Sequence, residues 1–376
     1  MDARILRVTP DLYPYSWGGI AVHTYLMSKY QAKSGHSVTV LTGEDSDHED
    51  RQPDEFEVHR LPGVRDLFGN PVLPGIWRYV RRNLGDFDVV HVHSQLFFSS
   101  LFAVWARHAN EIPAILTCHG VRSSAVPFAV SDLYLRTVTR ATLPRVQCVL
   151  CYSEQDARLL ARLTHTSFER MQVVPNGVPL EMFRPARAAT EKSPVILWAG
   201  RMVRYKGLNL LLAAMKRVVQ VVPMARLLLL GTGPELASVR EEVERLRLCG
   251  HVDLGRDRPF EDMPRVYEQS AVCVVPSITE GMPRTLMEAA ASGTPVVATQ
   301  LPQLLRFAGK GVVLFEPGSV NQLADSLTKI LTDADFAEQL SVEARILAEK
   351  EFSWDRTVAM TSQLCERFAS PSKPEG

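Results

Sequence analysis

Short apolar runs alternate with longer amphipathic segments along almost the whole chain. In the first half, the runs 5–8, 38–41 and 114–118 are rich in Val, Ile and Leu, as expected for strands that are buried on both faces. The segments 21–33 and 96–108 have the spacing of apolar positions that is typical of helices. This alternation predicts an α/β fold built on parallel sheets.

The same alternation begins again in the second half of the chain. The apolar run 195–199 is followed by a helical segment at 208–222, and further runs and helices continue towards the C-terminus. Residues 181–192 lack apolar periodicity and are predicted to be an interdomain linker. We therefore expect an N-terminal domain at 1–178, a second domain at 193–352, and a C-terminal segment at 353–376 with an amphipathic helix and a disordered tail.

Composition narrows the function classes. The 376 residues include 42 Lys and Arg against 42 Asp and Glu, so no net charge favours nucleic acid as a partner. The sequence contains no run of 18 apolar residues, so no transmembrane helix is predicted, and the first residues lack a signal-peptide pattern. We expect a globular, cytoplasmic protein.

Six cysteines are scattered along the chain, and Cys148 and Cys151 fit a C-x-x-C pattern. That pattern can indicate redox or zinc chemistry, but no second pair completes a zinc site. Strand alternation would place these two sulfurs on opposite faces of a sheet. Buried thiols in a reducing compartment are the preferred interpretation.

One strand–loop–helix–strand unit in the second half carries the most chemistry. Its loop contains Glu280 and Gly281, Pro283 stands at a plausible first helical position, and Glu288 follows inside the helix. Ligands of open parallel sheets bind beyond the carboxyl ends of strands, where free N–H groups at a helix start attract anions. The alternative is a surface ion pair between Arg284 and Glu288, which are four residues apart.

A basic loop follows the strand at 195–199. Arg201 and Lys206 lie five residues apart between that strand and the next helix. A guanidinium and an ammonium at a strand end are suited to hold a pyrophosphate. A solvated basic loop is the alternative interpretation.

These motifs together resemble the signature of the retaining nucleotide-sugar glycosyltransferases of the group-1 (family four) type. The resemblance rests on Glu280, Gly281 and Glu288 ahead of Gly-Thr-Pro-Val-Val, and on Gly-Arg, four residues, Lys-Gly around Arg201 and Lys206. It implies the GT-B fold, in which two doubly wound Rossmann-like domains face each other across a cleft and a final helix crosses back to the first domain. It also implies transfer of a sugar from a UDP- or GDP-sugar to a glycan, lipid-linked or small-molecule acceptor, with retention and without a metal or other cofactor.

The resemblance further implies roles for single residues. Arg201 and Lys206 would hold the diphosphate, and Glu288 would hold the ribose hydroxyls. Glu280 would hold the transferred sugar, which His119, after the strand 114–118, would meet from the first domain. The remaining donor-side positions are Gly18, Gly19, Gly231, Gly233, Gly281, Met282, Pro283 and Arg284, with Met282 standing where the family often has an aromatic residue.

The acceptor side is less determined. In the family the region matching 121–143 shapes the acceptor pocket, and this segment contains several Ser, Thr and Arg residues. The candidates for acceptor contacts are Tyr15, Trp17, Arg122, Ser123 and Ser124. None of them identifies the acceptor.

Two further patterns leave alternatives open. The basic, aromatic segment 77–83 is preferably interpreted as a solvated helix face. The alternative is an interfacial patch beside anionic lipid, which would make the protein peripheral at the cytoplasmic membrane face. His91 and His93 would lie on one strand face as a metal pair, but no third ligand is nearby, so packing or a place at the cleft edge is preferred. The Asp-x-Asp pattern occurs at 45–47, 86–88 and 333–335, too often to indicate a metal site.

Two other functions compete with sugar transfer. A GT-B nucleotide-sugar epimerase or glycan phosphorylase would share the fold, although a phosphorylase would need a cofactor-lysine signature and a much longer chain. A non-catalytic sugar-nucleotide-binding protein would have less need of Arg201, Lys206, Glu280 and Glu288 together.

Overall fold

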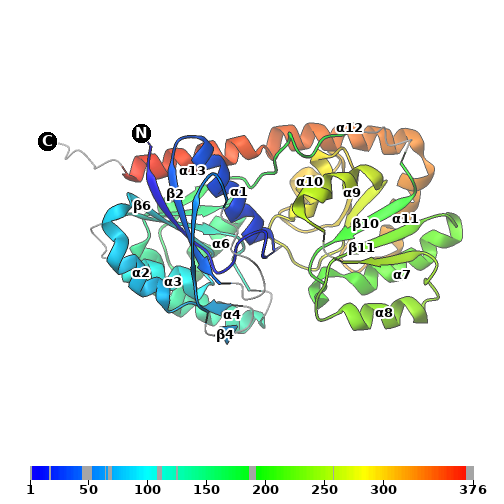
Figure 1. Ribbon diagram of the computed structural model, residues 1–376. Helices are drawn as coiled ribbons and strands as arrows, with labels where there is room; N and C mark the ends of the chain where they lie inside the picture. Colours follow the sequence, from blue (N-terminus) through cyan, green and yellow to red (C-terminus); the bar gives the residue numbers. More distant parts are fainter. Residues whose placement is uncertain are drawn as a thin grey trace. The chain divides into compact units, whose positions relative to one another are not determined.

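In the computed structural model, residues 2–16, 18–44, 53–63, 65–66, 70–107, 112–123, 126–185, 192–256 and 258–369 are described. The chain divides into two compact units (Figure 1). The first unit contains Met1–Pro175 together with Arg356–Gly376, and the second contains Asn176–Asp355. The C-terminal helix therefore belongs to the first unit although it follows the second in sequence.

The first unit is built on a seven-stranded parallel sheet with the order β3-β2-β1-β6-β7-β8-β9. The strands are β1 (Arg4–Val8), β2 (Ser37–Gly43), β3 (Glu57–Leu61), β6 (Val89–His93), β7 (Ala114–Cys118), β8 (Cys148–Cys151) and β9 (Met171–Val173), with a separate pair β4 (Arg65–Asp66) and β5 (Pro71–Val72). The helices are α1 (Gly19–Lys33), α2 (Gly75–Asn83), α3 (Phe98–Ala106), α4 (Phe128–Tyr134), a π-helical turn (Leu135–Thr139), α5 (Arg140–Thr142), α6 (Glu154–Thr164) and α13 (Trp354–Ala369).

Both faces of this sheet are covered, which explains why its strands are apolar throughout. One hydrophobic cluster contains Val8, Val92 and Leu116 and extends to α2, α3 and α6. The cluster on the other face includes Ile5 and Cys365, the latter from α13. Helix α13 is thus part of a core, not a surface appendage.

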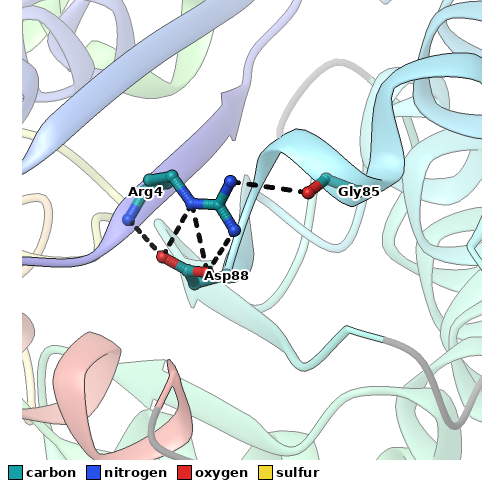
Figure 2. Close-up of polar contacts among 3 residues, drawn as sticks. All are labelled: Arg4, Gly85 and Asp88. Carbon is teal, nitrogen blue, oxygen red and sulfur yellow. Dashed lines mark hydrogen bonds and ion pairs between the residues drawn. The ribbon is translucent and has the colours of Figure 1, made fainter.

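A polar contact ties the sheet together at the edge opposite to the strand ends that carry candidate chemistry. The Arg4 guanidinium donates to both oxygens of Asp88, at 2.7 Å to Oδ1 and 3.2 Å to Oδ2, and to the Gly85 carbonyl at 3.5 Å (Figure 2). The Arg4 N–H also donates to Asp88. This contact holds the start of β1 beside the start of β6 and lowers the pKa of Asp88.

The second unit has a six-stranded parallel sheet with the order β12-β11-β10-β13-β14-β15. The strands are β10 (Val195–Ala199), β11 (Arg226–Leu230), β12 (Val252–Gly255), β13 (Val272–Val275), β14 (Val296–Thr299) and β15 (Val312–Phe315). The helices are α7 (Leu208–Val221), α8 (Leu236–Arg245), α9 (Met263–Gln269), α10 (Arg284–Ala291), α11 (Val320–Thr332) and α12 (Ala334–Glu351), with 3₁₀ turns η6 (Arg204–Lys206), η7 (Phe260–Asp262) and η8 (Leu305–Phe307).

Both sheets reverse their strand order at one point. In the first unit this switch lies between β1 and β6, and in the second between β10 and β13. Successive connections leave on opposite faces at such a point, so a crevice opens at the carboxyl ends of the two strands. The predicted two-domain, parallel α/β architecture is confirmed.

Several details test the sequence analysis. Cys148 and Cys151 are free thiols and pack into the clusters on opposite sides of the sheet, as predicted. The helix predicted at 96–108 is shorter, Phe98–Ala106, because residues 94–97 form a turn after β6. Helix α12 was not predicted. The Asp-x-Asp at 45–47, the tail 370–376 and most of the predicted linker, 186–191, lie outside the described residues.

Candidate active site

The loops that follow β10 and β13 meet at the switch point of the second unit. Gly207 ends the η6 turn with φ +71°, and a Cβ there would lie 2.0 Å from the carbonyl oxygen of Pro276. Only glycine permits this approach. Ile278 also donates its N–H to the Tyr205 carbonyl at 2.8 Å. These contacts bring the loop that carries Lys206 against the loop that carries Glu280.

Lys206 and Glu280 form an ion pair between these two loops. The ammonium donates to Glu280 Oε1, which also accepts from Ser277 Oγ at 2.8 Å. Gln303 fixes the loop by donating to the Glu280 carbonyl at 2.7 Å. Glu280 Oε2 accepts no hydrogen bond from the described residues. The carboxylate is therefore held on one side and available on the other.

Arg201 lies in the same region but has a different environment. Its exposed guanidinium forms no hydrogen bond or ion pair with any residue that the structure describes. Gly231 and Gly233 lie beneath its loop, because a Cβ on either would come within 1.9 Å of the Gly200 carbonyl or 2.4 Å of the Met202 carbonyl. The two glycines thus let the turn after β11 pack against the loop of Arg201.

Glu288 is buried in α10, and both of its carboxylate oxygens accept hydrogen bonds. Its Oε1 accepts from Arg284 Nε at 2.5 Å and its Oε2 from the Tyr267 hydroxyl at 2.9 Å. Burial and the neighbouring carboxylate raise the pKa of Tyr267 well above its ordinary value. The Arg284 guanidinium lies 4.6 Å from the Phe260 ring centroid. The Arg284–Glu288 pair weighed in the sequence analysis exists, but it is interior and not at the surface.

Two donors in this cluster remain unused. Arg284 Nη1 and Nη2 are buried without a hydrogen-bond partner among the described residues. Helix α10 begins after Pro283, and the N–H groups of its first turn lack partners inside the helix. Gly281 and Met282 lie half-buried in the loop just before it. The start of α10 therefore concentrates donors where an anion would be stabilised.

In the first unit, His119 lies just beyond the end of β7. Its Nε2 is 2.9 Å from His93 Nδ1 and its Nδ1 is 2.7 Å from the Tyr152 hydroxyl. Burial lowers the pKa of His119 to about 3, so the imidazole is neutral near pH 7. Both ring nitrogens are occupied, and a substrate could reach one only by replacing Tyr152 or His93.

His91 and His93 share one face of β6, as predicted, and their rings stack with centroids 4.6 Å apart. Burial lowers the pKa of both well below the ordinary value. The expectation that no third ligand is nearby is wrong, because folding brings His23 from α1 and His119 beside His93. These residues are distant in sequence, so no local spacing shows their proximity.

The loop after β1 leads into α1 through Gly18 and Gly19. A Cβ on Gly19 would meet no described atom within 4 Å, so packing does not require glycine there. In the same loop, the ring of Tyr15 has the Arg60 guanidinium 4.3 Å from its centroid. The start of α1 is open to close approach by a ligand.

The other predicted acceptor contacts are less available. Arg122 donates to both oxygens of Asp132, at 2.6 and 3.1 Å, and Ser123 donates its N–H to Ser131 Oγ at 3.0 Å. Trp17 and Ser124 lie outside the described residues. These acceptor assignments stay predictions.

Several contributing residues were missed by sequence reasoning. Tyr152 directly follows β8, so its strand-end position could have indicated it. Ser277 lies three residues before Glu280 in the predicted ligand loop. Tyr267 lies in α9 and His23 in α1, where no sequence signal separates them from packing residues.

Two family models match this chain. Residues 17–182 match the family model described as glycosyltransferase family 4, and residues 181–346 match that of glycosyl transferases group 1. The two matches adjoin and together extend over most of the chain. The chain belongs to the group 1 glycosyltransferases. The predicted family is thereby confirmed, and the protein is a transferase that moves sugars.

Relatives of this glycosyltransferase share its full length. A D-inositol 3-phosphate glycosyltransferase of Xylanimonas cellulosilytica is 29% identical, covering 91% of this chain and 90% of the relative. A GDP-mannose:cellobiosyl-diphosphopolyprenol alpha-mannosyltransferase of Xanthomonas oryzae is 24% identical over 94% of each chain. The crystal structure of Anabaena HepE with UDP and glucose aligns with a TM-score of 0.79 at 18% identity, covering 98% of this chain and all of HepE. Such neighbours confirm the GT-B fold.

The sequence of this glycosyltransferase predicts no transmembrane helix. Within the described parts of the chain, no helix has the length and apolar character needed to cross a bilayer. This agrees with the absence of a long apolar run in the sequence.

Proposed function

We propose that this group 1 glycosyltransferase moves a sugar from a UDP- or GDP-sugar to a hydroxyl of a glycan, lipid-linked or small-molecule acceptor, with retention and without a metal. The observation that carries the proposal is the Lys206–Glu280 pair at the switch point of the second unit. It sets a cation and a carboxylate side by side, near the free donors at the start of α10. A nucleoside diphosphate linked to a sugar has the complementary arrangement of anionic and hydroxyl groups.

The cationic groups suit a diphosphate leaving group. Lys206 uses one ammonium hydrogen on Glu280, and two others remain for phosphate oxygens. The guanidinium of Arg201 has no competing partner among the described residues. Negative charge grows on the diphosphate as the glycosyl bond breaks, and groups already in place stabilise it at that stage.

The carboxylates would hold the neutral parts of the donor. Glu280 Oε2 can accept from hydroxyls of the transferred sugar. Glu288 would meet the ribose only if a hydroxyl replaced the Tyr267 or Arg284 hydrogen bond. His119 would contact the sugar from the first unit, at the cost of one of its two present partners.

Retention requires that the new bond form on the face that the leaving group departs from. We propose the front-side route: the bond between the sugar C1 and the phosphate oxygen breaks, and the acceptor oxygen bonds to C1. The acceptor proton passes to the departing phosphate oxygen. Glu280 has no nucleophilic role in this route, because the acceptor oxygen bonds to C1 directly.

The relatives support a donor of this class but divide on its base. One is named for GDP-mannose, and HepE was crystallised with UDP and glucose. We expect a subset of UDP- or GDP-sugars to raise the melting temperature of the full-length protein, since a ligand at 100 times its Kd stabilises the native state by about 2.7 kcal/mol. Differential scanning fluorimetry over a donor panel measures this.

Turnover with the stabilising donor completes the test. With an accepted hydroxyl compound, NMR should show a glycoside that keeps the donor's anomeric configuration, and EDTA should not lower the rate. An inverted product would overturn retention, and an epimerised nucleotide-sugar formed without acceptor would favour the epimerase. Absence of stabilisation by every UDP- and GDP-sugar would reject the proposed donor class.

We also propose that the first unit contacts anionic lipid through a surface on α2, α3 and α5. An apolar surface pocket of about 490 Å³ lies there between Trp77 and Trp105, lined also by Leu101, Phe102 and Val138. Indole rings suit the interfacial region of a bilayer, and neighbouring arginines suit its anionic headgroups. The basic neighbours are Arg78, Arg81 and Arg82 on α2, Arg136 and Arg140 on the segment from α4 to α5, and Arg145, whose guanidinium lies 3.9 Å from the Trp105 ring centroid.

Charge reversal should separate this surface from a merely solvated helix face. Changing Arg78, Arg81 and Arg82 to Glu should abolish co-sedimentation with phosphatidylserine vesicles, since each nearby basic residue contributes about 1 kcal/mol to such binding. The matched control changes Lys216, Arg217 and Arg240, exposed residues of the second unit, to Glu. Equal binding by both triple variants would reject the proposal.

A further inference from the structure

Three imidazoles from three separate elements converge at the carboxyl edge of the first sheet. His23 comes from the first turns of α1, His93 ends β6, and His119 follows β7. One ring nitrogen from each can be chosen so that all three lie within 4.8 Å of one another. His23 and His93 are buried and His119 is half-buried, so the cluster has an inner part and one accessible member.

The hydrogen-bond contacts around the cluster show which ring nitrogens are available to a ligand. The fully buried Arg7 guanidinium donates to Ser28 Oγ at 2.8 Å and lies with Nη2 3.3 Å from His91 Nδ1, so these contacts occupy no nitrogen of the three histidines. His93 Nε2 is buried and has no hydrogen-bond partner among the described residues. His93 Nδ1 is the nitrogen that faces His119, and Nε2 is left to carry the ring proton.

We propose that His23, His93 and His119 form a binding site for a divalent transition-metal ion, with Zn²⁺ as the ion that fits best. Three neutral imidazoles with a fourth position left for water are a ligand set that Zn²⁺ accepts. Mg²⁺ and Ca²⁺ require oxygen ligands, which three imidazoles do not supply. The Tyr152 hydroxyl, 2.7 Å from His119 Nδ1 and 3.4 Å from His23 Nδ1, is placed to orient two of the ligands.

The geometry needs only side-chain adjustment. In a tetrahedral site with Zn–N distances of 2.0–2.1 Å, ligand nitrogens lie roughly 3.3 Å apart. His93 Nδ1 and His119 Nε2 are now 2.9 Å apart, and the widest separation in the cluster does not exceed 4.8 Å. The present separations therefore differ from the tetrahedral value by no more than about 1.5 Å.

The site would have a consequence for transfer, and this step alone rests on the proposed function. His119 is the residue through which the first unit would meet the donor sugar. A metal ion on His119 would occupy that ring, so Zn²⁺ would inhibit transfer while leaving the second unit's donor contacts intact. The ion is a competing ligand in this proposal and not a cofactor of the reaction.

Metal titration of the full-length protein tests the site without measuring activity. After EDTA treatment, Co²⁺ should bind in one equivalent with the visible absorption of four-coordinate cobalt, and Zn²⁺ should displace it. His23→Gln and His119→Gln should each weaken binding by more than about 100-fold, beyond the 10–100-fold expected for loss of an outer-shell partner such as Tyr152→Phe. His59→Gln, an exposed histidine of the same unit, is the matched control and should bind as the wild type.

The outcomes are distinct from those of the donor assay. Absence of stoichiometric Co²⁺ or Zn²⁺ binding, or equal loss in the His59 control, would overturn the metal site, whatever the transferase activity. Tight binding that both His23→Gln and His119→Gln abolish, with unchanged circular dichroism, would establish it even if no sugar were transferred. His23→Gln keeps the test valid if His119→Gln perturbs the fold near Tyr152.

Discussion

Lys206→Ala is expected to lower kcat/KM for sugar transfer by roughly 10²–10³-fold, the usual effect of removing one preorganised group that stabilises a developing anion. The corresponding loss is about 2.7–4 kcal/mol of transition-state stabilisation. Its physical cause is the removal of the ammonium that is paired with Glu280, in the loop that leads into α10. Steady-state kinetics with the donor identified by thermal stabilisation measures the effect.

Stability should fall less than it does for the Glu288 variant below. The Glu280 side chain, 12% exposed, loses its ammonium partner but keeps the hydrogen bond from Ser277. The matched control is Arg204→Ala, which removes an exposed cation from the same η6 turn. Wild-type turnover in Lys206→Ala, or an equal loss in Arg204→Ala, would reject the assigned role.

The placement of Lys206 and Glu280 was predictable from the sequence. Each follows a short apolar run, and the carboxyl ends of neighbouring parallel strands meet at one edge of a sheet. Topology therefore brings the two together once β10 and β13 are adjacent. The direct ion pair was not predictable, because it depends on Gly207 packing against Pro276.

The histidine cluster could not be predicted in the same way. His23, His93, His119 and Tyr152 come from four elements, and only the packing of α1 over the strand ends brings the first beside the others. Sequence spacing reports neighbours on one element, as it did for His91 and His93. It does not report side chains that meet through tertiary packing.

Burial was the second property that the pattern did not determine. The spacing of Arg284 and Glu288 is the same for an exposed pair and an interior one. Here Tyr267 and Phe260 close over the pair, with Glu288 only 4% exposed. Exposure decides the energetic consequence, because a solvated pair contributes little and an interior pair is costly to break.

Glu288→Ala is accordingly expected to destabilise the protein by about 3–5 kcal/mol. The change leaves the Arg284 guanidinium buried with no counter-charge, and it removes the acceptor of the Tyr267 hydroxyl. Urea unfolding followed by circular dichroism measures the free energy of unfolding. Tyr267→Phe is a control that removes one hydrogen bond to the carboxylate but keeps the ion pair, and it should cost less, about 1.5–3 kcal/mol.

The double variant Arg284→Met, Glu288→Leu separates charge burial from packing. Replacing both members of an interior pair by apolar residues removes the unpaired charge, so most of the lost stability should return. A double variant as unstable as Glu288→Ala would show that shape, and not charge, governs this part of the core. The unpaired buried charge would then not be the cause of the lost stability, contrary to this prediction.

The double variant also tests, independently of stability, whether the Arg284–Glu288 pair takes part in donor binding. If Glu288 binds the ribose hydroxyls, the refolded double variant should bind UDP or GDP at least about 10-fold more weakly, since a hydrogen bond to a charged group contributes about 1.5–3 kcal/mol. Isothermal titration calorimetry below the melting transition measures that affinity. Unchanged affinity in a stable double variant would exclude both Arg284 and Glu288 from nucleotide binding, and the ribose would then be bound by other groups at the start of α10.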